Sequence, residues 1–319
     1  MVHVTDDAAH PHATVSVVVC AYTGARWPLL AAAIDSVERQ TTPAHETIIV
    51  IDHNEALLDR ARAAYPDAVV VASAHTRGLS GARNTGIERA TGSVTAFLDD
   101  DAVAEPDWLA QLASVFEDAT AVGAGGAVRP AWQESQPRWF PDEFLWVVGC
   151  AHSGMPQRRE PVRNVIGANM AFPTATLREL GGFDSRVGRV GTLPAGCEET
   201  ELCIRATRGS ATGLIIYEPT AAVDHAVPPE RATLHYFLTR CRAEGRSKAV
   251  VARLVGSGPG LAAERTYTRS TLPRGIGRGL RQALRGDPGG LLRAAAIIVG
   301  LAVTTLGYVE GRLARGDGA

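Results

Sequence analysis

The sequence has few cysteines and none of the spacings in which cysteines usually act together. Its 319 residues contain five, and no two of them form a Cys-x-x-Cys pair or stand at the spacing of a metal finger. Scattered cysteines in an odd number exclude a disulfide framework and are typical of chains that fold in a reducing cytosol. We expect these thiols to serve as small apolar side chains.

An excess of charge of one sign is also lacking. The chain carries 32 Lys and Arg against 34 Asp and Glu, a formal net charge of −2. This balance excludes nucleic acid as a partner attracted by overall electrostatics. Residues 1–14 contain His and Asp but lack the apolar segment of a signal peptide, so we expect a disordered leader and a catalytic part that stays in the cytoplasm.

The first half of the chain contains a regular alternation of short apolar runs and helical stretches. The runs lack the polar–apolar alternation of half-exposed strands, which predicts strands buried on both faces. Their alternation with helices predicts an α/β fold with a mostly parallel central sheet wrapped by helices. The expected strands are 15–20, 47–51, 68–72 and 93–98, and the expected helices are 28–39, 54–64, 80–90 and 106–117.

The second half is less regular. It opens with a long aromatic segment, 129–161, and loops of this length in a compact domain are usually functional. The elements expected after it are an apolar run at 165–172, a helix at 174–180, an acidic helix start at 198–205, strands at 213–217 and 221–224, and a helix from 229 to about 254.

Polar side chains follow three of the expected strands where each strand ends. The first strand runs into Ala21 and Tyr22, the second into Asp52, and the fourth into three consecutive aspartates at 99–101. The carboxyl ends of parallel strands lie at one edge of the sheet, which is where such folds bind ligands. We therefore expect these side chains to converge on one site.

Three adjacent carboxylates after a buried strand repel one another unless a cation joins them. Mg²⁺ and Mn²⁺ prefer oxygen ligands and keep phosphate and water in their coordination shell. A divalent ion bridging a diphosphate is thus the simplest partner for Asp99, Asp100 and Asp101. The alternative is a solvated acidic turn that opens the following helix, and the neighbouring polar strand ends favour the metal site.

Three further features could belong to an active site, but each alone is weak evidence for one. Arg83, within the Gly-bearing segment 80–86, offers a fork of donors to a phosphate or an acidic side chain, or is a surface arginine near a helix cap. Glu198 and Glu199 open a helix, where one carboxylate can take a proton from an attacking hydroxyl or can simply complement the helix dipole. His225 follows a strand and either completes a metal site or is structural.

Taken in order along the chain, these features closely resemble glycosyltransferase family 2, whose members are inverting enzymes with the GT-A fold. The matching features are the polar loop after the first strand, Asp52, Ala-Arg-Asn-x-Gly at 82–86, the three aspartates, Gly-Gly-Phe-Asp at 181–184, the Glu-Glu pair and His225. The resemblance covers residues 15–225. It implies a GT-A fold with a C-terminal helical extension and Mg²⁺ or Mn²⁺ as cofactor. The expected donor is a UDP-sugar, with GDP- and dTDP-sugars as the alternatives.

The resemblance also implies where donor and metal bind. The residues expected at the nucleotide-sugar pocket are Ala21, Tyr22, Asp52, Arg83, Asp99 and Asp100. The residues expected to hold the metal are Asp101 as the main ligand, with Asp99 and His225. Residues 15–128 would then form the nucleotide-sugar-binding half, and 129–255 the acceptor-binding and catalytic half, of one GT-A domain.

For the catalytic base, the resemblance indicates Glu199, with Glu198 in reserve. The chain departs from the family pattern in two ways: a glutamate stands where aspartate is common, and Cys197 falls between the expected Gly and Glu. Which of the two carboxylates acts therefore stays open.

A narrower resemblance concerns the acceptor. Residues 236–249, after His225 and Pro228, are similar to the subgroup of glucosyl-dolichyl-phosphate glucuronosyltransferases and their bacterial relatives. It implies a polyprenyl-linked or other membrane-near acceptor, either a glycan or a small molecule. Trp139 and Trp146 are expected to shape the acceptor site, or else to pack in the core.

The tail, 256–319, is expected to form a basic linker followed by an apolar membrane-proximal helix. Four arginines, Arg274, Arg278, Arg281 and Arg285, share one helical face, and a weakly charged run at 291–309 follows. This pattern favours a helix that lies peripherally on an anionic membrane, at the inner face of the cell membrane, over a true span. The alternative is a helix packed on the catalytic domain or on a second subunit.

Three other classes of protein fit the sequence less well. A nucleotidyltransferase should carry a Gly-rich basic phosphate loop directly after the first strand, whereas 21–27 contains one Gly and one Arg. A non-catalytic sugar-nucleotide-binding or scaffold protein should have lost acidic residues that are intact here. A processive synthase should carry several spanning helices and Gln-x-x-Arg-Trp, and their absence from the sequence favours addition of a single sugar.

Overall fold

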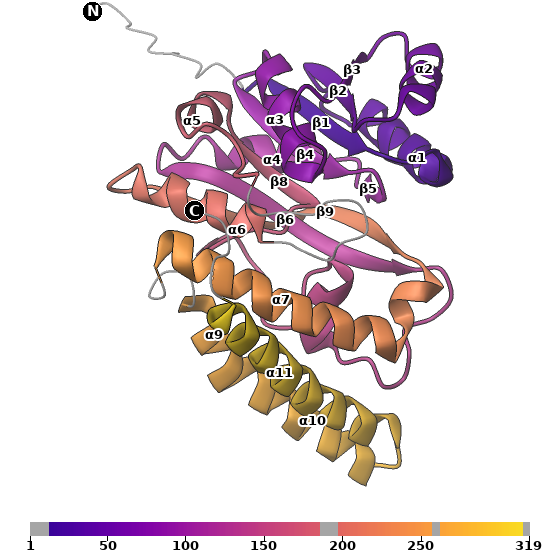
Figure 1. The fold of residues 1–319 in the computed structure, drawn as a ribbon, viewed down its shortest axis with the longest axis vertical. Coiled ribbons are helices and arrows are strands. Elements are labelled where there is room, and N and C mark those ends of the chain that lie inside the picture. Colours follow the sequence, from indigo (N-terminus) through magenta and orange to yellow (C-terminus); the bar gives the residue numbers. More distant parts are fainter. Residues whose placement is uncertain (1–12, 186–196, 257–261, 315–319) are drawn as a thin grey trace, which may run out of the picture.

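The computed structural model describes residues 13–185, 197–256 and 262–314 (Figure 1). The expected leader, 1–14, therefore lies almost wholly outside the described residues. The strands are β1 (Val15–Ala21), β2 (Glu46–Ile51), β3 (Val69–Ala72), β4 (Val94–Asp99), β5 (Ala102–Ala104), β6 (Ala121–Trp132), β7 (Glu160–Val162), β8 (Asn169–Pro173) and β9 (Leu214–Val227). The α-helices are α1 (Trp27–Glu38), α2 (Glu55–Ala64), α3 (Leu79–Arg89), α4 (Trp108–Val115), α5 (Thr174–Glu179), α6 (Glu198–Arg208), α7 (Leu234–Val255), α9 (Ala262–Thr266), α10 (Leu272–Leu284) and α11 (Gly289–Leu313). Short 3-10 or π segments are η1 (Gly24–Arg26), η2 (Asp142–Val148), η3 (Pro229–Ala232) and η4 (Tyr267–Thr271).

All the strands belong to one sheet, in the order β3-β2-β1-β4-β8-β6-β9-β5, with β7 paired to β9. The first four are parallel, as expected. β8 is antiparallel to both β4 and β6, and β5 and β7 are antiparallel to β9, so only part of the sheet is parallel. The α/β class is thus confirmed, but the sheet is more mixed than the apolar runs predicted, because a fully buried run carries no information about its direction.

The β1 strand shows how both faces of the sheet are covered. Val17 and Val19 belong to the apolar cluster that includes residues of α1 and α4. Val18 belongs to a second cluster, built with residues of α3, α5 and α6. Burial on both faces explains why the expected strand lacked polar alternation.

The two strands expected at 213–217 and 221–224 form one long strand, β9. It pairs in parallel with β6 from Leu214 to Val227, with a register shift between Gly126 and Val128. Its far end also pairs with β5, where Ala102 lies opposite His225. This pairing brings His225, which is distant in sequence, next to the aspartates at the end of β4.

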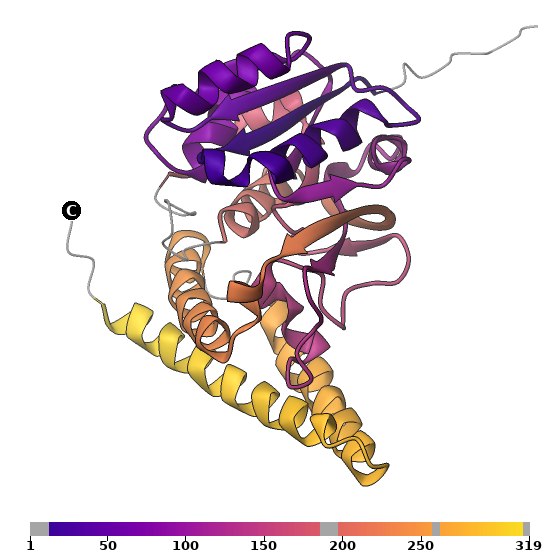
Figure 2. The same cartoon turned by 90° about the vertical axis from the view of Figure 1, so that its right-hand side faces the viewer.

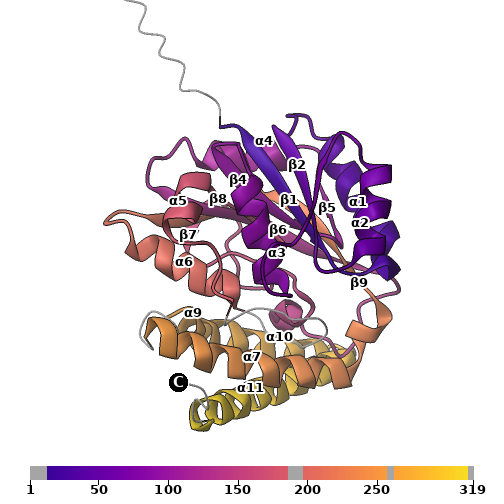
Figure 3. The ribbon, with the colours of Figure 1, turned by 45° about the horizontal axis from the view of Figure 1, so that its top comes forward.

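The tail forms a helical hairpin rather than a linker followed by one helix. α10 and α11 run side by side, and α11 packs along α7 (Figures 2 and 3). The backbones of α7 and α11 meet at glycines: a Cβ on Gly245 would lie 2.1 Å from the carbonyl oxygen of Thr304, and one on Gly307 would lie 2.1 Å from that of Arg242. Small residues at these positions therefore allow α11 to pack closely on the catalytic core.

The outer face of α11 stays apolar and exposed. The helix is long and apolar enough to cross a membrane by length and composition, and 33% of its apolar window is buried within the protein. Its exposed large side chains are Leu291, Leu292, Ile298, Val299, Leu301, Leu306, Val309 and Leu313. One face of α11 thus packs on the protein while another faces outward.

Candidate active site

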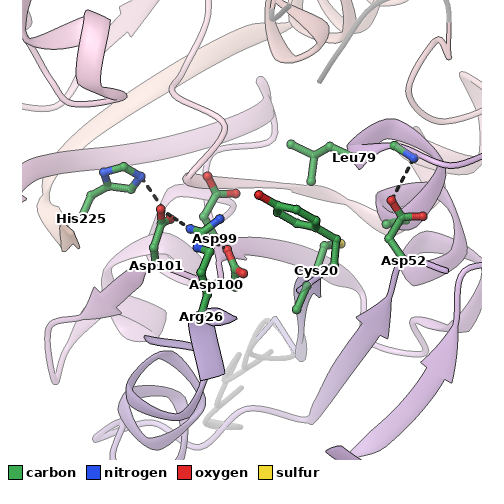
Figure 4. Close-up of a pocket in the computed structure, with 12 residues that line it drawn as sticks. Cys20, Arg26, Asp52, Leu79, Asp99, Asp100, Asp101 and His225 are labelled. Carbon is green, nitrogen blue, oxygen red and sulfur yellow. Dashed lines mark hydrogen bonds and ion pairs between the residues drawn. The ribbon is translucent and has the colours of Figure 1, made fainter. Parts of the chain in front are cut away.

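The polar ends of β1, β2 and β4 converge on one cavity of about 70 Å³ (Figure 4). Ala21 and Tyr22 line it from β1, and Asp52 lines it from the end of β2. One carboxylate oxygen of Asp52, Oδ2, accepts a hydrogen bond from the backbone N–H of Gly78 at 3.0 Å, and the other lies 2.7 Å from Nδ1 of His53. The structure therefore brings together the three expected nucleotide-pocket residues nearest the N-terminus.

The three aspartates lie beside this cavity. Asp99, Asp101 and His225 each offer a ligand atom, and these atoms lie within 4.8 Å of one another. In addition, the buried Oδ2 atom of Asp100 has no hydrogen-bond partner. Two carboxylates and an imidazole at this separation fit a divalent cation, so the residues present suit the implied metal.

Electrostatics at this cluster depend on burial and on close charge pairs. Burial and the neighbouring carboxylates raise the pKa of Asp100 to about 7, against the effect of Arg26. Although burial opposes it, the ion pair with His225, together with Arg26, holds the pKa of Asp101 well below its usual range. The same pair, at 3.2 Å, raises the pKa of His225 to about 10 against the effect of burial.

Arg83 is buried and connects the metal-side acids to helix α6. Its NH1 group donates to Oε1 of Glu198 at 3.0 Å, and its NH2 group donates to Oδ1 of Asp99 at 3.2 Å and to the carbonyl oxygen of Gly167 at 3.0 Å. A buried charge is stable only when it is paired in this way. The structure therefore excludes the surface-arginine alternative for Arg83.

Glu198 and Glu199 differ in their surroundings. Glu198 is buried in the Arg83 ion pair, whereas Glu199 is partly exposed and accepts a hydrogen bond from the hydroxyl of Thr200 at 3.3 Å. Burial and the like charge of Glu198 raise the pKa of Glu199 to about 8. Glu199 therefore keeps its proton to a higher pH than a carboxyl group in water does.

The helix that carries both acids starts at an unusual residue. Cys197 precedes α6 with φ +74°, a left-handed conformation that favours glycine. Its thiol donates to Oε1 of Glu244 in α7 at 3.4 Å. The departure from the family pattern noted in the sequence thus falls on a strained position next to the candidate base.

A second cavity, of about 620 Å³, opens beside the acids. Asp99, Glu198, Glu199 and His225 contribute to its wall. Further lining residues come from the aromatic segment, η4 and α11, among them Trp146, Tyr267, Leu301, Thr304, Thr305 and Tyr308. Trp146 therefore lines the cavity as expected, whereas Trp139 packs edge-on against Phe237 in an aromatic cluster.

Two arginines at the site were not among the residues expected from the sequence. Arg26 contacts both Asp100 and Asp101, and Arg231 reaches Oδ2 of Asp101 at 3.5 Å. Arg26 comes shortly after the polar end of β1, so its position in the sequence could have identified it as a site residue. Arg231 lies 130 residues from Asp101, and nothing in the sequence around it indicated that it reaches the site.

Comparisons with known proteins agree with this geometry. Residues 16–181 match the family model described as Glycosyl transferase family 2. The chain is 37% identical over 241 residues to the glucosyl-dolichyl phosphate glucuronosyltransferase of Haloferax volcanii, covering 74% of this chain and 77% of that one. It is 27% identical to the succinoglycan biosynthesis protein ExoM of Rhizobium meliloti, covering 71% of each.

The fold is similar to that of solved glycosyltransferases. The mannosyltransferase PcManGT of Pyrobaculum calidifontis, solved with GDP-Man and Mn²⁺, superposes with a TM-score of 0.58 at 19% identity, over 92% of this chain and 87% of that one. The α/β sheet, the acids after β4 and the matched segment 16–181 all lead to one assignment. This chain belongs to glycosyl transferase family 2 and is a glycosyltransferase.

Proposed function

We propose that the protein transfers one sugar from a nucleotide-sugar, with UDP as the expected nucleotide, to a lipid-linked acceptor, with inversion at the anomeric carbon. The observation that carries the proposal is the position of Glu199, which lines the large cavity together with Asp99 and His225 of the acidic cluster. Donor and acceptor can therefore meet between a carboxylate able to take a proton and the residues that would hold the diphosphate.

On the donor side, the nucleotide occupies the cavity at the ends of β1 and β2. Asp52, next to Ala21 and Tyr22, is the candidate partner of the base, and Asp99 and Asp100 face the ribose and phosphates. Arg83 supports this side through Asp99 rather than by direct contact, because its guanidinium is buried in ion pairs. PcManGT was solved with a nucleotide-sugar, GDP-Man, which supports a donor of this class.

For the metal, Asp101, Asp99 and His225 are the candidate ligands, with Mg²⁺ or Mn²⁺ as the ion. When bound, the ion supplies charge that stabilises the departing nucleoside diphosphate. Asp101 has both oxygens directed at cations, which orients its carboxylate toward the cluster. Mn²⁺ in the PcManGT complex supports this choice of ion.

The transfer itself is a single displacement. The acceptor oxygen forms a bond to the anomeric carbon as the bond from that carbon to the phosphate oxygen breaks, and the electron pair leaves with the nucleoside diphosphate. Glu199 takes the acceptor hydroxyl proton as the oxygen attacks. Glu198 holds Arg83 and so positions the start of α6.

Two observations support a lipid-linked acceptor over a free sugar or small molecule. The large cavity runs from Glu199 to α11, where Leu301 and Tyr308 line it. The relative from Haloferax volcanii is named for a dolichyl phosphate acceptor. A long apolar chain would therefore extend from the transfer centre toward the hairpin.

The hairpin would place the enzyme on an anionic membrane at the cytoplasmic face. Arg274, Arg281 and Arg285 are exposed on α10, next to the apolar outer face of α11. Because α11 packs along α7 and Glu310 pairs with Arg242 of that helix, an in-plane position fits better than a span, which would draw charged parts of α7 into the bilayer.

Replacing Arg274, Arg281 and Arg285 together by glutamine is expected to weaken binding to anionic vesicles by about 150-fold, since each basic residue contributes about 1 kcal/mol near such a surface. Sedimentation with phosphatidylserine-containing and neutral vesicles measures the effect. A matched variant, with Arg39, Arg62 and Arg89 replaced, removes three exposed charges, one directly after α1 and the others on α2 and α3, and should bind like wild type. Equal loss in both variants would contradict a specific role for the hairpin.

A thermal-shift panel tests the donor site. With Mn²⁺, one of UDP, GDP, dTDP and ADP is expected to raise the melting temperature by about 4 °C at a hundredfold excess over its Kd, because ligands that bind only the folded state stabilise it. Without metal the shift should be much smaller. No metal-dependent shift with any nucleotide would contradict the proposed function.

A further inference from the structure

The Arg26 side chain occupies a position that the proposed metal chemistry does not explain. It comes from η1, in the connection between β1 and α1, and its NH2 group lies 2.9 Å from Oδ1 of Asp100 and also contacts Oδ2 of Asp101 (Figure 4). Its side chain is 21% exposed, whereas those of the two aspartates are 7% and 5% exposed. A partly exposed arginine thus pairs with two buried acids.

Arg26 contacts one carboxylate oxygen of Asp101, which is the proposed main metal ligand. Oδ1 of Asp101 faces His225 at 3.2 Å, while Oδ2 faces Arg26 and, at 3.5 Å, Arg231. A guanidinium and a divalent cation on one carboxylate repel each other strongly in a buried site. Binding of the ion through Asp101 therefore requires Arg26 to withdraw.

Arg26 can withdraw without disturbing the core. No residue of η1 is buried, and a Cβ added to Gly24 would meet no atom within 4 Å. Arg26 also lines the cavity that contains Tyr22 and Asp52, where the nucleotide is proposed to bind. Its planar fork of donors is well suited to a diphosphate.

We propose that Arg26 is a positioning residue that competes with the metal for Asp101 and moves to the donor diphosphate when metal and nucleotide bind together. Binding of the ion alone is then weak, and binding of each ligand strengthens binding of the other. The competition between Arg26 and the metal is inferred from the Arg26 ion pairs alone. The move of Arg26 to the diphosphate also depends on the proposed function.

The test measures binding rather than catalysis. Isothermal titration gives the Kd of Mn²⁺ with and without saturating UDP, or whichever nucleotide the panel identifies, for wild type, Arg26→Ala and Arg26→Lys. In wild type, UDP should tighten Mn²⁺ binding at least about 10-fold, within the usual range of coupling between sites. Arg26→Ala should bind Mn²⁺ alone about 10-fold more tightly than wild type and lose most of that coupling, and Arg26→Lys should lie between the two.

Arg39→Ala is the matched control, because Arg39 is an exposed arginine that follows α1 and pairs with Asp35 at 3.8 Å. It should behave as wild type. Equal or weaker binding of Mn²⁺ alone by folded Arg26→Ala, judged from its thermal melt, would overturn the competition. Tighter metal binding with unchanged coupling would overturn the move to the diphosphate, and failure of every variant to bind any nucleotide would overturn the proposed function while leaving the metal comparison valid.

Discussion

Replacing Glu199 by glutamine is expected to lower kcat about 1,000-fold while leaving nucleotide affinity unchanged, because general-base catalysis contributes about 100- to 10,000-fold. The variant keeps the shape of the side chain but cannot take the acceptor proton. Product formation from radiolabelled donor measures the rate, and the thermal-shift panel measures binding. The aspartate variant should retain partial activity, because it keeps the carboxylate but shortens its reach.

The raised pKa of Glu199 predicts a pH dependence for both rate and stability. A base acts in its ionised form, so the rate of the wild-type enzyme should rise with pH through about 8. The unfolded chain releases this proton near pH 4.3, so between these values folding keeps a proton that the unfolded state loses, and stability falls as pH rises. Glu199→Gln removes this penalty and should melt about 2–4 °C above wild type at pH 8, but not at pH 4.

Glu198→Gln provides the contrast that separates the two acids. It leaves Arg83 buried without its full countercharge, so its melting temperature should fall. If Glu198→Gln abolished turnover in a folded protein while Glu199→Gln kept the wild-type rate, the assignment of the base would be reversed.

Asp101→Asn is expected to abolish stabilisation by Mn²⁺ and to lower kcat about 1,000-fold, equal to about 4 kcal/mol of transition-state stabilisation. Asparagine keeps the volume and one oxygen of the side chain, but it loses the negative charge shared by His225 and Arg26. Mn²⁺ titration followed by melting temperature measures the first effect, and donor turnover measures the second.

Asp59→Asn, on the exposed face of α2, is the control for loss of one carboxylate. It should keep the metal-dependent shift and the activity of wild type. Retention of the Mn²⁺ effect in folded Asp101→Asn would show that the ion binds elsewhere and would remove Asp101 from the metal site.

Local pattern was enough to predict most of the N-terminal half. The expected strand at 15–20 differs from β1 by one residue, and the expected helix at 80–90 is shifted from α3 by one, because burial on both faces and flanking glycines leave clear marks in the sequence. The same local marks placed Asp52, Asp99 and Glu199 at the ends of elements. The parallel pairing of β1 with β2 and β4 explains why Asp52 and Asp99 converge, whereas Glu199 reaches the site from α6.

The rest depends on contacts between distant residues. The ion pair of Arg83 with Glu198 joins positions 115 residues apart, and no periodicity in either segment announces it. The insertion of β8 between β4 and β6 depends on where a long aromatic segment returns to the sheet. The hairpin of α10 and α11 was not predicted, because the arginines of α10 also fit an exposed basic linker.

The position of α11 has a consequence for how such an enzyme would be assayed. One helix provides both a wall of the large cavity, where the acceptor is proposed to bind, and the exposed apolar face proposed to rest on lipid. An enzyme built in this way searches for its acceptor in two dimensions. Its velocity should follow the mole fraction of acceptor in the bilayer, so that adding inert lipid at constant acceptor would slow the reaction although the bulk concentration of acceptor had not changed.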